Sequence, residues 1–342
     1  MSGAVITGAG RALPATYTQE QVWDGFFAEH YAGLRSAHRV FSAAGVRTRH
    51  AVVNPVHEDI SQWGTGARMA RYVDEAMPLG KQAVASALDS AGLAPGDVGL
   101  FSVVTCTGYA TPGLDIRLAS DLGMPNSVQR LLVGHMGCYA ALPGLGAVGD
   151  YVAARSRPAV MLCIELTSLH VQPARHDLSQ VVAHALFSDA ASAVVLEPDA
   201  RRGMRVAATV ARTDSSTADH MTWDVTDLGF KMGLSPRVPD VLARHVGDVV
   251  QELLDTAGLR VEDVAGWAVH PGGPRILDVA RDQLGLTEEQ MAPSRRVLAE
   301  HGNCSSATVL LVLEELGEVD GPVVAMAFGP GLTLYATLLL PA

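Results

Sequence analysis

Short, wholly apolar runs alternate with longer amphipathic segments along the first half of the chain. The runs at 96–106, 157–166 and 189–198 predict buried strands, and the apolar spacing of residues 81–92 predicts an amphipathic helix. Residues 130–138 predict a further strand, which runs into an Ala-rich helix. Strands buried on both faces and separated by helices indicate a layered α/β fold, because helices must cover both faces of such a sheet.

The second half repeats this alternation. Its expected elements are, in order, a strand at 206–211, a helix at 239–259, a strand at 264–271, a helix at 273–286, a helix from Ser305 and a strand at 322–328. Similar alternation suggests a duplicated α/β unit with halves at 1–198 and 199–342, although no repeat is obvious. Pro, Asp and Arg cluster at Glu197–Gly203 without a low-complexity linker, so we expect the halves to share one large interface.

The composition narrows the class of protein. The chain has 342 residues, 48% of them hydrophobic and 18% charged, which is ample material for a large core and unlike a disordered chain. A formal charge of −11 argues against a nucleic-acid-binding surface, although a few arginines can still hold an anionic ligand. No run reaches the roughly 20 apolar residues that span a bilayer. The first residues lack a signal-peptide pattern, so we expect a cytoplasmic protein with no membrane partner.

The cysteines are the first candidates for chemistry. Without an export signal we expect Cys106, Cys138, Cys163 and Cys304 to be reduced thiols, and the absence of a CxxC pair argues against structural zinc. Cys138 follows Gly137 at the end of a predicted strand and precedes the Ala-rich helix. A helix N-terminus favours the thiolate and lowers the pKa of a cysteine placed there. The alternative is a buried structural cysteine.

A thiolate nucleophile needs an imidazole partner and a group that stabilises an oxyanion. His270 follows an apolar strand in WAVHPGGPRILD, and Asn303 lies in the Gly-flanked turn EHGNCSSATV. Alone, His270 fits a surface or satisfied core histidine, and Asn303 fits a helix cap. Three polar groups on strand-end turns, in the order Cys138, His270 and Asn303, favour a catalytic set.

Several motifs are shared with a known family. They are GCYAALPG around Cys138, HPGGPRILD around His270, GNCSSAT around Asn303, AFGPGLT at 327–333, CTGYATPGLD at 106–115, HALFSDAASAVVL at 184–196 and RVPDVL at 237–242. On these motifs the chain resembles the type III polyketide synthases, the chalcone-synthase-like branch of the thiolase superfamily. The motifs occur in the family's order over most of the chain, so the set is specific.

The resemblance implies a five-layered αβαβα thiolase fold, a homodimer, and CoA thioester substrates that enter by a narrow tunnel. By position, Cys138 carries the acyl starter and His270 keeps it as a thiolate. His270 and Asn303 would hold the thioester carbonyl of a malonyl-CoA-type extender and stabilise the enolate left by decarboxylation. The enolate attacks the starter in a Claisen condensation, and the chain then cyclises to a small aromatic or a pyrone. These steps need neither a metal nor a redox cofactor.

The family also has aromatic gatekeepers between tunnel and cavity. Phe187 matches the first of them, with a core phenylalanine as the structural alternative. The second falls on Met232, where many relatives have Phe, unless the alignment slips by two residues to Phe230. A methionine there is flexible and adapts to different substrates.

Further cavity positions differ from the plant members of the family. Cys106 falls where plant chalcone synthases carry Thr and bacterial naphthalene-forming relatives carry Cys, whereas His170 and Trp223 replace smaller side chains. Trp223 would limit chain growth or wall a tunnel for an apolar starter, and its alternative is a partly exposed loop aromatic. Thr111 takes the place of a Met that usually reaches the partner's cavity.

The remaining expected contacts also follow from the resemblance. Those for CoA at the tunnel mouth are Arg47, Arg49, Gly272, Gly273 and Arg275. Those for the cavity wall are Ser305 and the turn formed by Gly329, Pro330 and Gly331, where glycines permit close backbone approach.

Three other functions fit parts of the pattern. A ketoacyl-ACP synthase III uses a similar set for one condensation but lacks the HPGGPRILD and GFGPG-like patterns. A non-catalytic thiolase-fold partner has no need of all three polar residues. A thiol sensor would rest only on the proximity of Cys106 and Cys138. The starter, the number of extensions and the cyclisation mode depend on cavity shape and stay open.

Overall fold

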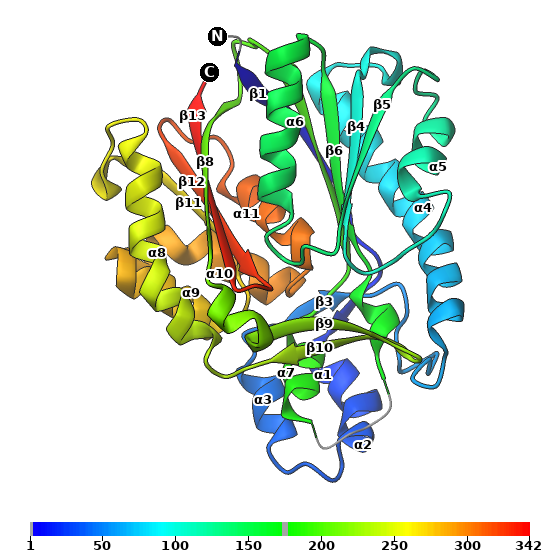
Figure 1. Cartoon of the computed structure of the whole chain (residues 1–342). Coiled ribbons are helices and arrows are strands. Elements are labelled where there is room, and N and C mark those ends of the chain that lie inside the picture. Colours follow the sequence, from blue (N-terminus) through cyan, green and yellow to red (C-terminus); the bar gives the residue numbers. More distant parts are fainter. Residues whose placement is uncertain (1–2, 173–176) are drawn as a thin grey trace.

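The apolar runs pair into one nine-stranded sheet built from two half-sheets (Figure 1). The computed structural model describes residues 3–172 and 177–342. The first half-sheet contains β5 (Gln129–Gly134), β4 (Leu100–Thr105), β6 (Ala159–Glu165), β7 (Ala190–Pro198) and β1 (Ala4–Ala12). The second contains β8 (Met204–Thr213), β13 (Thr333–Pro341), β12 (Val323–Gly329) and β11 (Gly266–Val269). Among the described strands, the two half-sheets hydrogen-bond to each other only where Val5 and Ile6 of β1 pair with Arg205 and Met204 of β8.

Helices cover both faces of each half-sheet. Between the half-sheets lie α6 (Ala141–Arg155) and α11 (Thr308–Leu316), which share one buried cluster with strands of both halves. The outer helices of the first half are α4 (Thr65–Ala91) and α5 (Leu114–Asp121). Those of the second half are α8 (Val238–Asp255), α9 (Pro274–Leu284) and α10 (Glu288–His301). The order of layers is therefore helix, sheet, helix, sheet, helix, as expected.

The remaining segments gather at one end of the sheet, at the bottom of Figure 1. From the first half come β2 (Thr16–Thr18), α1 (Gln19–Val22), a π-helical turn (Trp23–Phe27), α2 (Ala28–His30), α3 (Ala37–Ala43), β3 (Thr48–His50) and α7 (Leu178–Leu186). From the second half comes the hairpin of β9 (Met221–Thr226) and β10 (Gly229–Leu234). Because α7 packs on both α3 and β10, the two halves jointly close this end of the molecule.

Several element boundaries differ from the sequence-based prediction. Helix α4 begins at Thr65 rather than at residue 81, although Pro78 and Gly80 lie inside it. Gly80 is needed for packing, because a Cβ there would lie 2.8 Å from a methyl carbon of Leu118. Helix α10 and the β9–β10 hairpin were not predicted, since polar residues interrupt both patterns. The expected divide at 198/199 falls between β7 and β8. Within the described ranges, no helix has both the length and the apolar composition to cross a membrane.

Candidate active site

Cys138 lies in the turn between β5 and α6, three residues before the first residue of the helix. Gly137 has φ +81°, a conformation that favours glycine, and a Cβ there would lie 2.6 Å from Cδ of Pro330. The neighbouring Gly329 packs closely too, since a Cβ there would lie 3.3 Å from the backbone nitrogen of Cys138. The turn of Gly329, Pro330 and Gly331 therefore supports the cysteine loop from behind.

The Cys138 thiol is buried, and burial dominates its ionisation. Desolvation raises the pKa of Cys138 to about 12, although hydrogen bonds from Ser305 and Asn303 act in the opposite direction. The expectation that helix placement would lower this pKa is therefore wrong for the site without substrate. The helix begins beyond the cysteine, and its first turn does not compensate for the loss of water around the sulfur.

His270 follows β11, and its backbone N–H donates to the carbonyl of Met326 over 2.8 Å. The side chain is fully buried, and its ring packs edge-on to Phe328. Neither ring nitrogen has a hydrogen-bond partner in the described part of the chain. Burial lowers the pKa of His270 to about 3, so the imidazole is neutral at physiological pH.

Asn303 lies between α10 and α11, and its backbone is tied to the chain around Phe187. Its N–H donates to Leu186 over 2.8 Å, and its carbonyl accepts from Ser188 over 2.9 Å. The side-chain Oδ1 accepts from the N–H of Ser305 over 2.9 Å, which assigns the Nδ2 group to the side facing Cys138. Asn303 therefore fits both interpretations made from the sequence. Its Oδ1 accepts from the backbone as a helix cap does, and its Nδ2 is the donor in the site.

Cys138, His270 and Asn303 line one cavity of about 480 Å³, here called the main cavity. The rest of its wall is mostly apolar and comes from α3, α7, the β9–β10 hairpin, the starts of α8 and α9 and the end of β12. It includes Val40, Leu178, Val182, Leu186, Met221, Leu234, Pro236, Val238, Ile276 and Phe328. A thiol, an imidazole whose two nitrogens have no partner among the described residues and an amide donor thus share a mostly apolar cavity, which suits acyl transfer.

Comparison with known proteins identifies the family. The family model for the N-terminal domain of chalcone and stilbene synthases matches residues 2–200, and the model for their C-terminal domain matches residues 207–341. The chain belongs to the chalcone and stilbene synthase family.

Individual relatives agree with this membership. The chain is 37% identical to a 1,3,6,8-tetrahydroxynaphthalene synthase of Streptomyces peucetius subsp. caesius, over 88% of this chain and 82% of that protein. It is 32% identical to the α-pyrone synthesis polyketide synthase-like Pks18 of Mycobacterium tuberculosis, over 88% of this chain and 81% of that one.

Solved structures give the same result. Polyketide synthase PKS-I of the brown alga Ectocarpus siliculosus superposes with a TM-score of 0.94 and 29% identity, covering 100% of this chain and 99% of its own. The tetrahydroxynaphthalene synthase of Streptomyces coelicolor A3(2), a bacterial type III polyketide synthase, has a TM-score of 0.91 and 27% identity, covering 98% and 99%. The predicted thiolase fold and the assignment as a type III polyketide synthase, an acyltransferase, are both confirmed.

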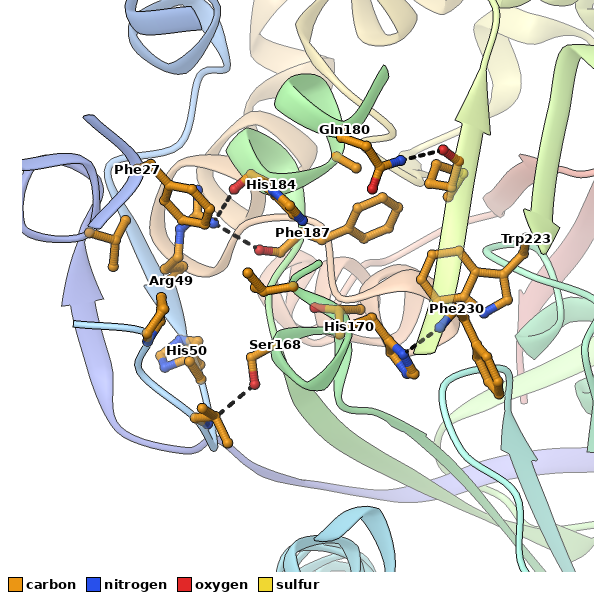
Figure 2. Close-up of a pocket in the computed structure, with 18 residues that line it drawn as sticks. Phe27, Arg49, His50, Ser168, His170, Gln180, His184, Phe187, Trp223 and Phe230 are labelled. Atoms are coloured by element: carbon orange, nitrogen blue, oxygen red, sulfur yellow. Dashed lines mark hydrogen bonds between the residues drawn. The ribbon is translucent and has the colours of Figure 1, made fainter. Parts of the chain in front are cut away.

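The synthase has a second, smaller cavity of about 60 Å³ beyond α7, here called the inner cavity (Figure 2). Ala183, Phe187 and Met232 line both cavities, so their side chains form the partition between them. Phe230 lines the inner cavity only. Of the two residues considered as the second gatekeeper, Met232 is therefore the one that shares the partition with Phe187.

Trp223 and His170 form an aromatic wall of the inner cavity together with Phe230. Trp223 lies in β9, half-buried, and its Nε1–H donates to the carbonyl of Cys106 over 2.7 Å. His170 accepts from the N–H of Phe230 at Nδ1 and donates to the carbonyl of Thr107 from Nε2. Trp223 is thus part of the cavity wall rather than an exposed loop aromatic.

Cys106 was expected in the cavity wall, but it lines neither the main cavity nor the inner cavity. Its sulfur is 3.4 Å from Oγ of Ser305, which also hydrogen-bonds Cys138, so one hydroxyl joins the two thiols. The backbone N–H of Cys106 donates to Glu165 over 3.0 Å, and Thr107 and Ser306 donate to the same carboxyl group. Glu165 was missed at the sequence level, although one charged residue in the apolar run MLCIEL was a signal.

The arginines expected at the mouth separate into two kinds. Arg275 is exposed and lines the main cavity with Gly272 and Gly273, and Arg47 is exposed and pairs with Glu300 over 3.3 Å. Arg49 is buried, and its guanidinium donates to the carbonyls of His184, Ala185 and Phe187 and to the side chain of Gln19. An expected CoA contact by Arg49 is therefore wrong, because its guanidinium lies in the interior.

Two exposed arginines that are adjacent in sequence to cavity-lining residues were not among the expected contacts. Arg39 lies on α3 beside Val40, and Arg237 lies between the cavity-lining residues Pro236 and Val238. Neither makes an ion pair with a described residue. Thr111 lies in an exposed loop and lines neither cavity of its own chain.

Proposed function

We propose that the synthase loads an acyl group from a CoA thioester onto Cys138 and extends it with a malonyl-CoA-type extender. The chain would then cyclise to a small aromatic or a pyrone. The observation that carries this proposal is that Cys138, His270 and Asn303 line one apolar cavity, with both nitrogens of His270 free of partners among the described residues. The relatives named as tetrahydroxynaphthalene and α-pyrone synthases support the class of product.

Loading would start from a neutral thiol and a neutral imidazole, because burial raises the pKa of Cys138 and lowers the pKa of His270. The imidazole takes the thiol proton as the sulfur attacks the thioester carbonyl. The resulting thiolate and imidazolium stabilise each other, whereas either charge alone would be unfavourable in a desolvated site. Collapse of the tetrahedral intermediate breaks the bond to CoA, and His270 returns the proton to the leaving thiolate.

Extension begins with a malonyl thioester whose carbonyl faces His270 and Asn303. The bond to the carboxylate breaks, CO₂ leaves, and the electron pair moves onto the thioester oxygen as an enolate. The Nδ2 group of Asn303 and one N–H of the neutral His270 donate to that oxygen. The apolar side chain of Phe187 deprives the malonyl carboxylate of solvation, which destabilises it and so assists the loss of CO₂. The enolate carbon attacks the acyl group, and Cys138 leaves as a thiolate. Proton and electron-pair transfers account for every step, so no metal or redox cofactor is required.

The CoA phosphates would bind at the mouth of the main cavity. Arg39, Arg237 and Arg275 come from three different elements around this opening, and all three are exposed. Their guanidinium groups suit phosphate recognition through paired N–H donors. Arg47 would contribute less, because Glu300 already pairs with it.

A homodimer would form along the free edge of the sheet. Strand β5 has no neighbour on its outer side among the described strands, and Leu131 and Leu132 on it are 37% and 46% exposed. Ile116 and Tyr109 add exposed apolar surface nearby in sequence, next to the loop of Thr111. An exposed apolar edge strand is a site for pairing with a second copy. All four cysteines are buried free thiols, which supports a cytoplasmic location.

The test uses the purified protein with ¹⁴C-malonyl-CoA and a panel of acyl-CoA starters. We expect repeated CO₂ release and a cyclised product, and the Cys138→Ala variant should make no product while still binding CoA thioesters. Full product formation by Cys138→Ala would overturn the proposal. A single β-keto product that depends on a carrier protein would instead indicate a ketoacyl synthase.

A further inference from the structure

The inner cavity contains polar groups that the proposed reaction leaves unused. Figure 2 shows Arg49 and Phe27 at one side of this cavity and Trp223 and Phe230 at the other. His170 in its wall is fully engaged in hydrogen bonds at both ring nitrogens. Arg49 and His184 each keep one ring or guanidinium nitrogen without a hydrogen-bond partner among the described residues. The two residues lie on β3 and α7, which are far apart in the sequence but in contact.

Arg49 is a buried cation with only neutral hydrogen-bond partners. Its terminal nitrogens donate to three backbone carbonyls and to the amide oxygen of Gln19, and its Nε–H has no partner among the described residues. Asp189 is the carboxyl group that acts on this charge, but its oxygens already accept from Val52, Thr167 and Ser168. A buried charge without a directly bonded counter-ion is costly, so an anionic group placed beside Arg49 would be stabilised.

His184 presents a second donor. Its Nδ1 is 2.5 Å from the hydroxyl of Tyr31, and burial keeps this phenol protonated by raising its pKa. Burial also lowers the pKa of His184 to about 3, so the ring is neutral. Nδ1 of His184 is the one hydrogen-bond partner of the Tyr31 hydroxyl among the described residues, so we assign the phenol as the donor, which places the ring proton on Nε2. This nitrogen makes no hydrogen bond in the described part of the chain, and the ring lines the inner cavity.

We propose that the inner cavity is a subsite for a carboxylate at the far end of the starter acyl group, held by Arg49 and His184. This inference rests on the proposed loading of Cys138. The size fits, because a cavity of about 60 Å³ is about four to six times the roughly 10–15 Å³ that one water needs, and a carboxylate has three heavy atoms. The acyl chain would reach it between Phe187 and Met232, and methionine side chains adapt readily to such a passage.

The selectivity is tested first on the unaltered protein with matched pairs of starters. Succinyl-CoA is compared with 4-methylpentanoyl-CoA, and glutaryl-CoA with 5-methylhexanoyl-CoA, since each pair differs only in replacing a carboxylate by an isopropyl group. The rate at which Cys138 is acylated is followed by intact-protein mass spectrometry in single turnover. We expect the better-fitting dicarboxylic starter to load at least about tenfold faster than its branched partner.

Variants separate binding from structural support. His184→Leu removes the Nε2 donor and should reduce loading of the dicarboxylic starter about tenfold while leaving the branched starter within about twofold. His184→Gln retains an amide donor and should keep part of the preference, and it serves if the Leu variant does not fold. His57→Leu is the control, because His57 is exposed and lines neither cavity.

Two outcomes overturn the inference. One is equal or faster loading of the branched starter in both pairs, which would mean that the cavity holds only water. The other is an equal loss for both starters in His184→Leu and His184→Gln, which would make His184 a support for the fold. If no CoA thioester acylates Cys138 at all, the proposed function fails instead, so the two failures are distinguishable.

Discussion

Asn303 shows how one side chain serves structure and chemistry at once. Its Oδ1 accepts the N–H of Ser305, which has the unusual φ of +50° for a residue with a side chain. This bond orients the amide, so that the Nδ2 group faces Cys138. The cost of the left-handed backbone, roughly 1–3 kcal/mol, is the kind of strain found where a site must be held in one geometry.

Asn303→Asp should lower malonyl-CoA decarboxylation by about 10²- to 10³-fold, since it removes the Nδ2 donor and keeps the Oδ1 acceptor for Ser305. Acylation of Cys138 by the starter should fall less, because Ser305 still hydrogen-bonds the sulfur after the Asn303 donor is lost. The measurement pairs ¹⁴CO₂ release with intact-protein mass spectrometry of loading. Equal losses in the two half-reactions would show that Asn303 only maintains the fold.

At the scale of elements, the cysteine loop depends on the turn that packs behind it. The loop between β5 and α6 and the turn between β12 and β13 come from opposite halves of the chain. They approach so closely that neither Gly137 nor Gly329 has room for a side chain without displacing the other segment. The position of the nucleophile is therefore decided by contact between the two duplicated halves.

Gly137→Ala should reduce both stability and loading rate. The methyl group must be accommodated at φ +81° and 2.6 Å from Pro330, so we expect a loss of at least about 1–3 kcal/mol in unfolding free energy. The control is Gly146→Ala within α6, where the nearest atom to an added Cβ is 3.8 Å away. That variant should be neutral or slightly stabilising. Denaturant unfolding and single-turnover loading measure the two effects, and unchanged behaviour of Gly137→Ala would contradict this account.

At the scale of the whole molecule, charge and apolar surface are unevenly distributed. The chain carries a net charge of −11, yet Arg275, which is exposed and has no ion pair with a described residue, lines the main cavity. The free sheet edge at β5 carries exposed leucines. In the interior, several histidines are buried in the neutral form. The exposed leucines bear on assembly, and the buried neutral histidines bear on the pH dependence of stability.

If the proposed homodimer forms along β5, Leu132→Lys should give a monomer, because a charge on the free edge of this strand opposes pairing with a second copy. Size-exclusion chromatography with light scattering measures the mass. Val225→Lys is the matched control, since Val225 is 70% exposed and lies on the β9–β10 hairpin. A dimer that persists in Leu132→Lys would exclude β5 as the interface.

Stability should fall as the pH drops from about 6.5. Burial lowers the pKa of His270 and His184 to about 3 and that of His170 and His50 to about 4. The folded state therefore binds fewer protons than the unfolded state below the unfolded pKa of 6.5. The stability held by these neutral rings is complete above that pH and is lost as pH falls through it.

Each histidine contributes about 1 kcal/mol of loss between pH 6.5 and 5.5. Two buried carboxyl groups with raised pKa, Glu165 and Asp189, change the stability in the opposite direction. Because they are two groups against four histidines, we expect the net change to be a loss of stability. Denaturant unfolding at the two pH values measures the difference. A stability that stays constant or rises toward pH 5.5 would contradict the neutral assignment of these rings.

The sequence by itself determined the layered α/β alternation, the family, and the set of Cys138, His270 and Asn303. These follow from local hydrophobic patterns and from motifs that each lie within a few residues. The strand-end turns that carry the three residues were visible for the same reason. The long helix α4 was recognised only in part, because Pro78 and Gly80 resemble helix ends when their packing is unknown.

Only the tertiary structure decided the properties that depend on burial and on distant partners. Arg49 faces the interior because its carbonyl acceptors lie on α7, more than a hundred residues along the chain. The pKa of Cys138 is raised because segments from both halves exclude water from it. The partition between the two cavities joins Phe187 to Met232 across the halves. Desolvation and cavity shape arise from the sum of such contacts, and no local pattern in the sequence encodes that sum.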